Sequence, residues 1–217
     1  MKVVAFLPAK GTSERVGSKN TRLLNGKPLF LHTLEKLSEC DFIDEVYLDS
    51  ESDEILAYAD PLGCKKIKRD ASLATNATGG HALLSHGIDH AMDADIYLQV
   101  FGTSPFVKKE TIKKGIDILR NSDEYDSVIL ARTQRHYIWI DGMPTYDQNH
   151  VPNTANLPPM VAETTGIYFI RGDVARKKRQ RVGDRPFLLE VSPLEAIDID
   201  YPEDFELAEI VSRGMTP

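Results

Sequence analysis

Short apolar runs alternate along the chain with longer segments whose apolar residues recur at helical spacing. The short runs predict strands at residues 3–7, 44–48, 64–67, 95–100 and 127–132. The segments between them predict helices at residues 29–37, 52–59, 79–92 and 108–121. This alternation predicts an α/β fold with a doubly wound, mostly parallel sheet.

The alternation is lost between about residue 133 and residue 162, where four prolines interrupt it. Residues 137–140, with the sequence Tyr-Ile-Trp-Ile, predict a strand outside the main sheet. Strands at 166–170 and 196–199 and a helix at 202–212 are expected beyond it. We therefore expect one domain over residues 1–217, with an inserted extension at about 133–162.

The composition narrows the classes of partner. Hydrophobic residues make up 41% and charged residues 27% of the chain, as in ordinary globular proteins. The net charge of −7 argues against broad binding of nucleic acid. No apolar run approaches the roughly 18 residues of a membrane span. Two cysteines, Cys40 and Cys64, do not make a disulfide framework, so we expect a reduced, cytoplasmic location.

The loop after the first predicted strand carries the first candidate chemistry. It begins with Pro8, Ala9 and Lys10, and the cations Arg15 and Lys19 follow within ten residues. The loop also contains two glycines and several polar residues, among them Ser13 and Asn20. Point charges and close backbone N–H groups are what a triphosphate requires. Ligands of doubly wound sheets bind at the carboxyl ends of strands, where this loop begins. The alternative is a flexible polar surface loop.

Two carboxylates near the C-terminus are the second candidate. Asp198 and Asp200 are two residues apart in a predicted strand, so their side chains face the same side. Mg²⁺ accepts one or two carboxylates and completes its shell with water and substrate phosphate. The alternative is that Asp200 only caps the helix that begins near Pro202. Asp204 is expected in the first helical turn, where the helix dipole favours it.

Several segments, taken in order, resemble one enzyme family. They are the loop at 7–20, Gly-Lys-Pro-Leu at 26–29, Arg69 with Leu73-Ala74, Thr-Ser-Pro at 103–105, Gly-Ile-Tyr at 166–168 and Ile-Asp-Ile-Asp at 197–200. Together they are similar to the motifs of the sugar-activating cytidylyltransferases. These are the CMP-acylneuraminate synthetases and their relatives that activate 3-deoxy-manno-octulosonate (Kdo). The resemblance spans nearly the whole chain.

The resemblance implies a Rossmann-like nucleotide-diphospho-sugar transferase fold and a reaction. CMP would pass from CTP to the anomeric hydroxyl of a nonulosonic, sialic-acid-like sugar, and pyrophosphate would leave. Lys10, Arg15 and Lys19 would hold the phosphates, and Asp198 and Asp200 would carry Mg²⁺, with Mn²⁺ as a substitute. Substrate contacts would come from Pro8, Ala9, Ser13, Asn20, Arg69, Thr103, Ser104 and Gly166. The extension would pair two subunits into a homodimer, and neither nucleic acid nor a membrane would be a partner.

Some positions depart from the family pattern. Lys10 replaces an arginine, Phe101 lies in the stretch that replaces Leu-Gln-Pro, Val107 replaces an arginine and Asn76 replaces an acidic residue. The Kdo branch has a metal-binding aspartate that is missing from residues 102–105, which favours a nonulosonic acid. Two alternatives stay open. One is a nucleotidyltransferase for another acceptor, such as Kdo or a non-sugar. The other is a nucleotide-binding regulator without turnover.

Two further signals favour simpler interpretations. His86 and His90 are four residues apart, but no third ligand with suitable spacing accompanies them, so a zinc site is disfavoured. The basic run at residues 176–181 could meet nucleic acid or lipid. A solvated helix end is the favoured interpretation, because the net charge is negative and the chain has one such run.

Overall fold

A seven-stranded sheet forms the centre of the molecule, in a computed structural model that describes residues 1–11 and 19–215. The strand order is β11-β7-β10-β6-β1-β4-β5. The strands are β1 (Val3–Pro8), β4 (Glu45–Ser50), β5 (Lys65–Lys68), β6 (Ile96–Val100), β7 (Ser127–Gln134), β10 (Met160–Arg171) and β11 (Pro186–Glu190). Among these strands all pairings are parallel except those of β10, which is antiparallel to β6 and to β7. The expected mostly parallel α/β sheet is confirmed.

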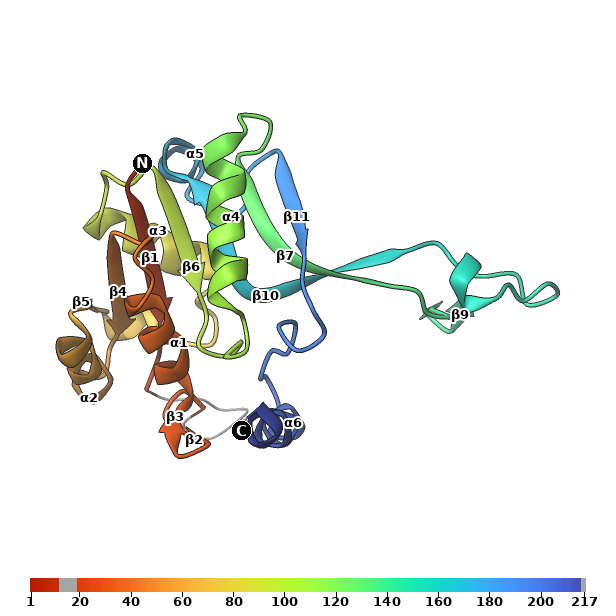
Figure 1. The fold of residues 1–217 in the computed structure, drawn as a ribbon, viewed down its shortest axis with the longest axis horizontal. Coiled ribbons are helices and arrows are strands. Elements are labelled where there is room, and N and C mark those ends of the chain that lie inside the picture. The colour runs from red at the N-terminus through yellow and green to blue at the C-terminus, as the bar shows by residue number, and fades with distance from the viewer. Residues whose placement is uncertain (12–18, 216–217) are drawn as a thin grey trace.

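Helices cover both faces of the sheet (Figure 1). On one face α1 (Leu29–Ser38) and α4 (Lys109–Asn121) pack over Val3, Ala5 and Leu7 of β1. On the other face α3 (Gly80–His90) and α5 (Gly172–Lys178) pack over Val4 and Phe6. Alternate residues of β1 thus enter two different cores, as a strand buried on both faces requires. Within the described residues no helix is long and apolar enough to cross a membrane.

The remaining elements are short, apart from the C-terminal helix. They are β2 (Leu23–Leu24), β3 (Lys27–Pro28), α2 (Asp53–Leu56), η1 (Ala57–Leu62), η2 (Ala71–Leu73), β8 (Trp139–Ile140), β9 (Met143–Pro144), η3 (Thr154–Asn156) and α6 (Pro202–Met215). Helix α6 has a small core of its own, in which Phe205 and Ala208 pack with Leu24, Leu29 and Ile199. This core attaches the C-terminal segment to the β2–β3 hairpin.

Two helix glycines set how closely the helices approach the sheet. A Cβ atom at Gly87 of α3 would lie 2.8 Å from the Phe6 ring, and one at Gly115 of α4 would lie 2.6 Å from the Phe169 ring. Real side chains do not tolerate such distances, so each aromatic ring occupies the space where a helix side chain would stand. Glycine therefore allows a large core side chain under each helix.

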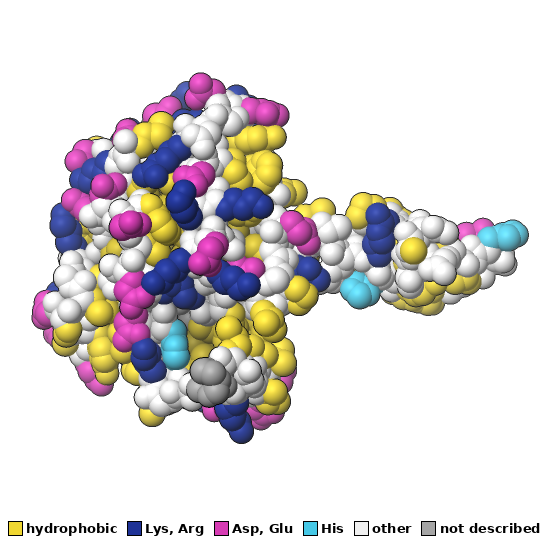
Figure 2. Space-filling view, in the orientation of Figure 1, with side chains coloured by type: hydrophobic (Ala, Val, Ile, Leu, Met, Phe, Trp, Pro, Cys, Tyr) yellow, Lys and Arg dark blue, Asp and Glu magenta, His cyan; other side chains and the backbone are white. Residues whose placement is uncertain are grey.

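A long arm projects from the sheet between β7 and β10 (Figures 1 and 2). These two strands continue as a pair past the sheet, with Met160 opposite Gln134. The hairpin of β8 and β9 lies in the arm and turns through Asp141 and Gly142, both with positive φ. Such a two-residue turn matches the twist of its strands. Trp139 is 55% exposed and Ile140 60% exposed, so the arm presents apolar side chains to solvent.

One expectation about the C-terminal third is wrong, and one strand there was not predicted. Residues 196–199 do not form a strand, because after the turn at 193–196 the chain runs extended without joining a ladder. The burial of Ile199 in the α6 core produces the apolar alternation there. The sheet instead gains β11, an edge strand in which Pro186 and Leu188 are exposed. The last turn of helix α5 contains the start of the basic run, in agreement with its interpretation as a helix end.

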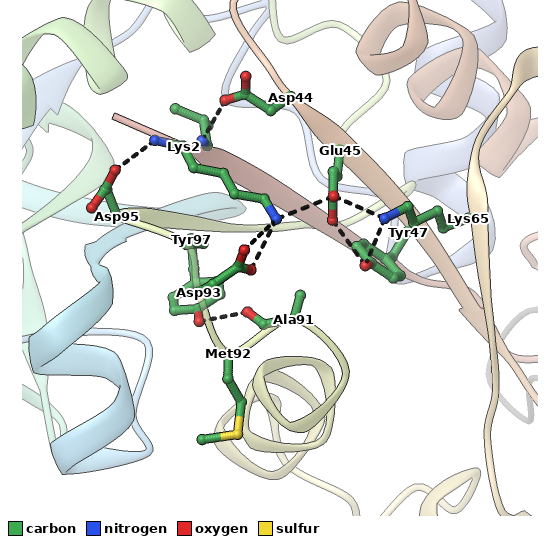
Figure 3. A network of polar contacts seen from close by, with 12 residues as sticks. Lys2, Asp44, Glu45, Tyr47, Lys65, Ala91, Met92, Asp93, Asp95 and Tyr97 are labelled. Atoms are coloured by element: carbon green, nitrogen blue, oxygen red, sulfur yellow. Dashed lines mark hydrogen bonds and ion pairs between the residues drawn. The ribbon is translucent and has the colours of Figure 1, made fainter.

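A polar network at the amino ends of the strands fastens the start of the chain (Figure 3). The Lys2 Nζ donates to Asp93 at 2.9 Å and pairs with Glu45 at 3.1 Å. Glu45 also accepts from the Tyr47 hydroxyl at 2.9 Å and pairs with Lys65 at 2.8 Å. The hydrogen bond from Lys65, followed by those from Tyr47 and Lys2, lowers the pKa of Glu45 from 4.5 to about 2.

We predict that Glu45→Gln lowers stability at neutral pH and flattens its acid dependence. A carboxyl group with a depressed folded-state pKa stabilises the fold above its unfolded pKa of 4.5 and loses that contribution as the pH falls through about 2. Thermal unfolding from pH 7 to pH 2 should therefore show a smaller fall in melting temperature for the variant. Glu206→Gln, at an exposed position on α6, is the control. Identical profiles for Glu45→Gln and the wild type would contradict the role of Glu45.

Candidate functional site

A polar cavity of about 210 Å³ opens at the carboxyl ends of β1 and β6. Six predicted site residues line it, namely Pro8, Lys10, Lys19, Asn20, Arg69 and Thr103. Other lining residues come from the 73–78 segment, α3 and Phe101. A larger hollow of about 490 Å³ lies beside α4 and β11, but no predicted residue reaches it. The cavity at the strand ends is therefore the candidate site.

Backbone and side-chain contacts hold both ends of the first loop. The Ala9 N–H continues the β1–β4 pairing by donating to the Asp49 carbonyl at 2.9 Å, and Ala9 is fully buried. The Asn20 side chain donates to the Lys10 carbonyl at 2.7 Å, and the Asn20 carbonyl accepts from the Phe30 N–H at 3.1 Å. Asn20 thus connects the two ends of the loop to the start of α1. The predicted residues Ser13 and Arg15 lie outside the described residues.

Arg69 is held at the back of the cavity by an aspartate that sequence reasoning missed. Its Nε donates to Asp49 Oδ1 at 2.9 Å, and its Nη2 donates to the Asp49 carbonyl at 2.7 Å. Both side chains are 2% exposed. Burial raises the pKa of Asp49, and the Arg69 guanidinium opposes that rise. An aspartate at the end of an otherwise apolar strand was the signal that could have found this pair.

The departures from the family pattern lie in two places, the cavity and the core. Asn76 lines the cavity and accepts a hydrogen bond from the Lys10 ammonium group. Phe101 also lines the cavity. Val107 is 2% exposed in the core and does not reach it. Beside Val107, Lys36 donates to the Pro105 carbonyl at 2.6 Å, and burial lowers the pKa of Lys36 to about 8. Lys36 therefore anchors the end of the Thr-Ser-Pro segment.

The two C-terminal carboxylates lie beside the first loop. The Lys19 Nζ donates to the Ile199 carbonyl at 2.8 Å and to Asp200 Oδ1 at 3.1 Å. The cation beside Asp200 thus comes from the first loop, 181 positions away in the sequence. The Lys19 side chain is 17% exposed. The loop and the C-terminal segment therefore form one site.

Asp198 is oriented by hydroxyl groups. Ser104 donates to Asp198 Oδ1 at 3.3 Å, and Thr165 donates to Asp198 Oδ2. Ser104 is itself buried, and a Cβ atom at Gly166 would lie 2.8 Å from its Cβ. Gly166 thus lets β10 pass close to Ser104. Ser104, which was predicted as a substrate contact, thus orients Asp198, and Gly166 provides the room for Ser104.

The Asp204 carboxylate caps the start of helix α6. The Asp204 carboxylate accepts from the backbone N–H groups of Asp200 at 3.0 Å and Tyr201 at 2.8 Å. A carboxylate in the first turn that reaches back in this way satisfies free N–H groups at the helix start. The expected position of Asp204, in the first turn of the helix, is confirmed.

The donor set fits a hard cation that the substrate helps to hold. Asp198 and Asp200 supply carboxylate oxygens, and no group of three or more His, Cys, Asp or Glu in residues 1–11 and 19–215 could hold a metal ion by itself. Mg²⁺ is commonly bound by one or two carboxylates together with substrate phosphates and water. The two carboxylates therefore fit magnesium bound together with a triphosphate.

The sequence model of the family described as "Cytidylyltransferase" matches residues 4–209. The CMP-N,N'-diacetyllegionaminic acid synthase of Legionella pneumophila subsp. pneumophila is 27% identical, over 96% of this chain and 95% of the relative. The pseudaminic acid cytidylyltransferase of Campylobacter jejuni is 28% identical, over 98% of this chain and 97% of the relative. Both alignments run nearly end to end.

Solved structures share the fold. The synthetase of CMP:2-keto-3-deoxy-manno-octonic acid, complexed with CTP, superimposes with a TM-score of 0.72 at 18% identity, over 99% of this chain and 100% of that chain. The 4-diphosphocytidyl-2C-methyl-D-erythritol synthase of Anaerococcus prevotii gives 0.73 at 17% identity, over 98% and 96%. The family match covers the strands, the first loop and the two C-terminal carboxylates. This chain belongs to the cytidylyltransferase family.

Proposed function

We propose that this enzyme transfers CMP from CTP to the anomeric hydroxyl of a nonulosonic, sialic-acid-like sugar. The observation that carries the proposal is the contact between the cationic loop and the carboxylate segment at the carboxyl ends of β1 and β6. It occurs in a chain that matches, end to end, relatives named for CMP-legionaminic and pseudaminic acid synthesis. Cytidylyl transfer needs phosphate-binding cations and metal-binding carboxylates in one place.

The chain's own residues would bind and orient the triphosphate. Lys10 and Lys19 line the cavity and would neutralise phosphate charge, Lys19 exchanging its carboxylate partner for the ligand. Arg69, fixed by Asp49, would form a rigid wall for the nucleoside. Magnesium held by Asp198 and Asp200 would offset the charge that develops during transfer. The acceptor hydroxyl would attack the α-phosphorus as the bond to the pyrophosphate oxygen breaks.

The expected location and assembly belong to the same proposal. Cys40 and Cys64 are free thiols in the structure, in keeping with a reduced cytoplasm. We also propose that the arm pairs two copies into a homodimer. Its exposed apolar side chains, including Trp139, Ile140 and the 69% exposed Met143, support this. Exposed apolar clusters of this kind mark protein interfaces.

We predict that pyrophosphate is released with CTP and a nonulosonic acid. Each of four nucleoside triphosphates should be tested against N-acylneuraminic, legionaminic and pseudaminic acids and Kdo. CTP should exceed UTP by roughly tenfold or more, because a site that pairs with the cytosine amino group leaves polar groups unpaired with uracil. Equal rates with UTP, or turnover with Kdo alone, would contradict the proposal. CTP binding without any turnover would identify a regulator instead.

We predict that Asp198→Asn and Asp200→Asn each lower turnover about 100-fold or more, the size expected when a charge-stabilising group is lost. Activity of the wild type should require Mg²⁺ or Mn²⁺ and vanish with chelator. Steady-state rates across a Mg²⁺ titration test this, with Asp173→Asn on α5 as the control. Because Asp198 and Asp200 lie partly exposed, melting temperatures should change little. Wild-type kinetics in both variants would contradict the assignment of the metal to these two residues.

We predict that the arm controls the oligomeric state. The double substitution Trp139→Asp and Ile140→Asp should convert a dimer into a monomer, because charges are costly in an apolar interface. Size-exclusion chromatography with light scattering measures this directly. Met92→Asp, at a 57% exposed position on the body, is the control. A monomeric wild type, or a dimeric double variant, would reject the role of the arm.

A further inference from the structure

The loop at residues 103–108 lies between β6 and α4 and contacts the segment that carries the two C-terminal carboxylates. Thr103 lines the cavity, and its carbonyl accepts from the Ile199 N–H at 2.9 Å. The next residue, Ser104, donates to Asp198 Oδ1 at 3.3 Å. The position of Asp198 therefore depends on the position of this loop.

Lys36 of α1 holds the loop through two of its backbone carbonyls. Pro105 and Val107 are both buried, and the Lys36 Nζ donates to their carbonyl oxygens at 2.6 and 2.5 Å. Buried carbonyl groups need hydrogen-bond donors, and an ammonium group offers three. Burial lowers the pKa of Lys36 to about 8, and interactions with Cys40 and Glu195 oppose that effect. One side chain of α1 therefore fixes the part of the loop that follows Ser104.

Glu195 joins the end of the same loop to the chain that leads into Asp198. Its side chain is buried, and its Oε1 accepts from the Lys108 N–H at 3.3 Å and from the Thr111 hydroxyl. Its Oε2 accepts from the Ser192 hydroxyl at 2.8 Å. The start of a helix favours negative charge, so the carboxylate is well placed at the first turn of α4. Glu195 therefore connects α4 to a point three residues before Asp198.

These two anchors matter because residues 196–200 belong to no strand of the sheet. The ion pair of Lys19 with Asp200 is partly exposed on both sides, and such pairs hold their partners only weakly. Hydrogen bonds to charged groups are stronger, and Lys36 and Glu195 each make more than one of them. The helices α1 and α4 therefore set the position of the carboxylates through these two side chains.

We propose that Lys36 and Glu195 are positioning residues for Asp198 in its role as a metal ligand. Lys36 fixes the loop that carries Ser104, and Glu195 fixes the segment that carries Asp198 itself. Neither residue is among the described residues that line the cavity, so both would act through Asp198 and not by touching the substrate. This inference rests on the proposed function, in which Asp198 and Asp200 hold Mg²⁺.

Calorimetric titration of the full chain with CTP, with Mg²⁺ or with chelator and without acceptor, tests the inference. The wild type should bind CTP more tightly when Mg²⁺ is present. Lys36→Met keeps the apolar stem and removes the donor. It should lower the affinity measured with Mg²⁺ about tenfold and leave the affinity measured without it within about twofold. Glu195→Gln places an amide donor where only acceptors fit, and should have the same effect.

Four further variants separate positioning from general stability. Thr111→Val removes one hydrogen bond to Glu195 and should lower the affinity with Mg²⁺ roughly threefold, which keeps the test valid if the larger changes prevent folding. Lys36→Arg retains donors and charge and should recover part of the loss. Glu45→Gln, which lowers stability at the far ends of the strands, and Lys113→Met, which removes an exposed lysine of α4, are the controls and should bind as the wild type does.

Two results would overturn the inference while the proposed function stands. In the first, folded variants of Lys36, Glu195 and Thr111 keep the wild-type affinity in the presence of Mg²⁺. In the second, their affinity for CTP falls equally with and without Mg²⁺, so that the residues only stabilise the fold. A wild type that gains no affinity for CTP from Mg²⁺ is a different outcome. It would contradict the metal assignment in the proposed function, and the inference would fail with it.

Discussion

The contact of Lys19 with Ile199 and Asp200 joins residues 180 and 181 positions apart. The carboxylate segment belongs to no strand, so the sheet ladder does not place it. Its position depends on Lys19, on the hydrogen bond from the Ile199 N–H to the Thr103 carbonyl at 2.9 Å, and on the burial of Ile199. Without these contacts the first loop and the carboxylate segment would not lie side by side.

The site combines fixed and exchangeable charges. The Asp49–Arg69 pair is 2% exposed on both sides, and removing one partner of such a pair costs about 3–5 kcal/mol because the other is left buried and charged. Lys19 and Asp200 are 17% and 44% exposed, and pairs near the surface contribute only about 0–1 kcal/mol. Arg69 is therefore a rigid wall, whereas Lys19 can change partner at small cost when a ligand arrives.

The sequence was informative where periodicity and local chemistry decide the structure. The first five predicted strands and the long helices follow the burial pattern of a sheet covered on both faces. The C-terminal third was harder to predict. The burial of Ile199 in a separate core gives residues 196–199 the apolar alternation that is typical of a strand. Strand β11 escaped notice because an edge strand leaves Pro186 and Leu188 exposed and blurs its pattern.

Partnerships between distant residues were beyond sequence reasoning. Nothing in the sequence near Asp49 indicates that its partner is Arg69, which lies 20 positions later. The resemblance indicated which residues gather at the site but not which of them hold one another. Ser104 and Gly166 illustrate this, since they were expected as substrate contacts and nothing in the sequence indicated that Ser104 would donate to Asp198 or that Gly166 would pass close to Ser104.

Four successive residues of strand β10 each make a different hydrogen bond. Glu163 accepts from Tyr168, Thr164 donates to the Leu130 carbonyl at 3.1 Å, Thr165 donates to Asp198, and the Gly166 carbonyl accepts from Phe101 at 2.9 Å. The pairing with β7 already shifts register between Glu163 and Tyr168, so this stretch cannot absorb another residue without turning its side chains over. An insertion in the inner half would therefore disturb the contact with Asp198, whereas an insertion in the arm beyond it would leave these contacts in place.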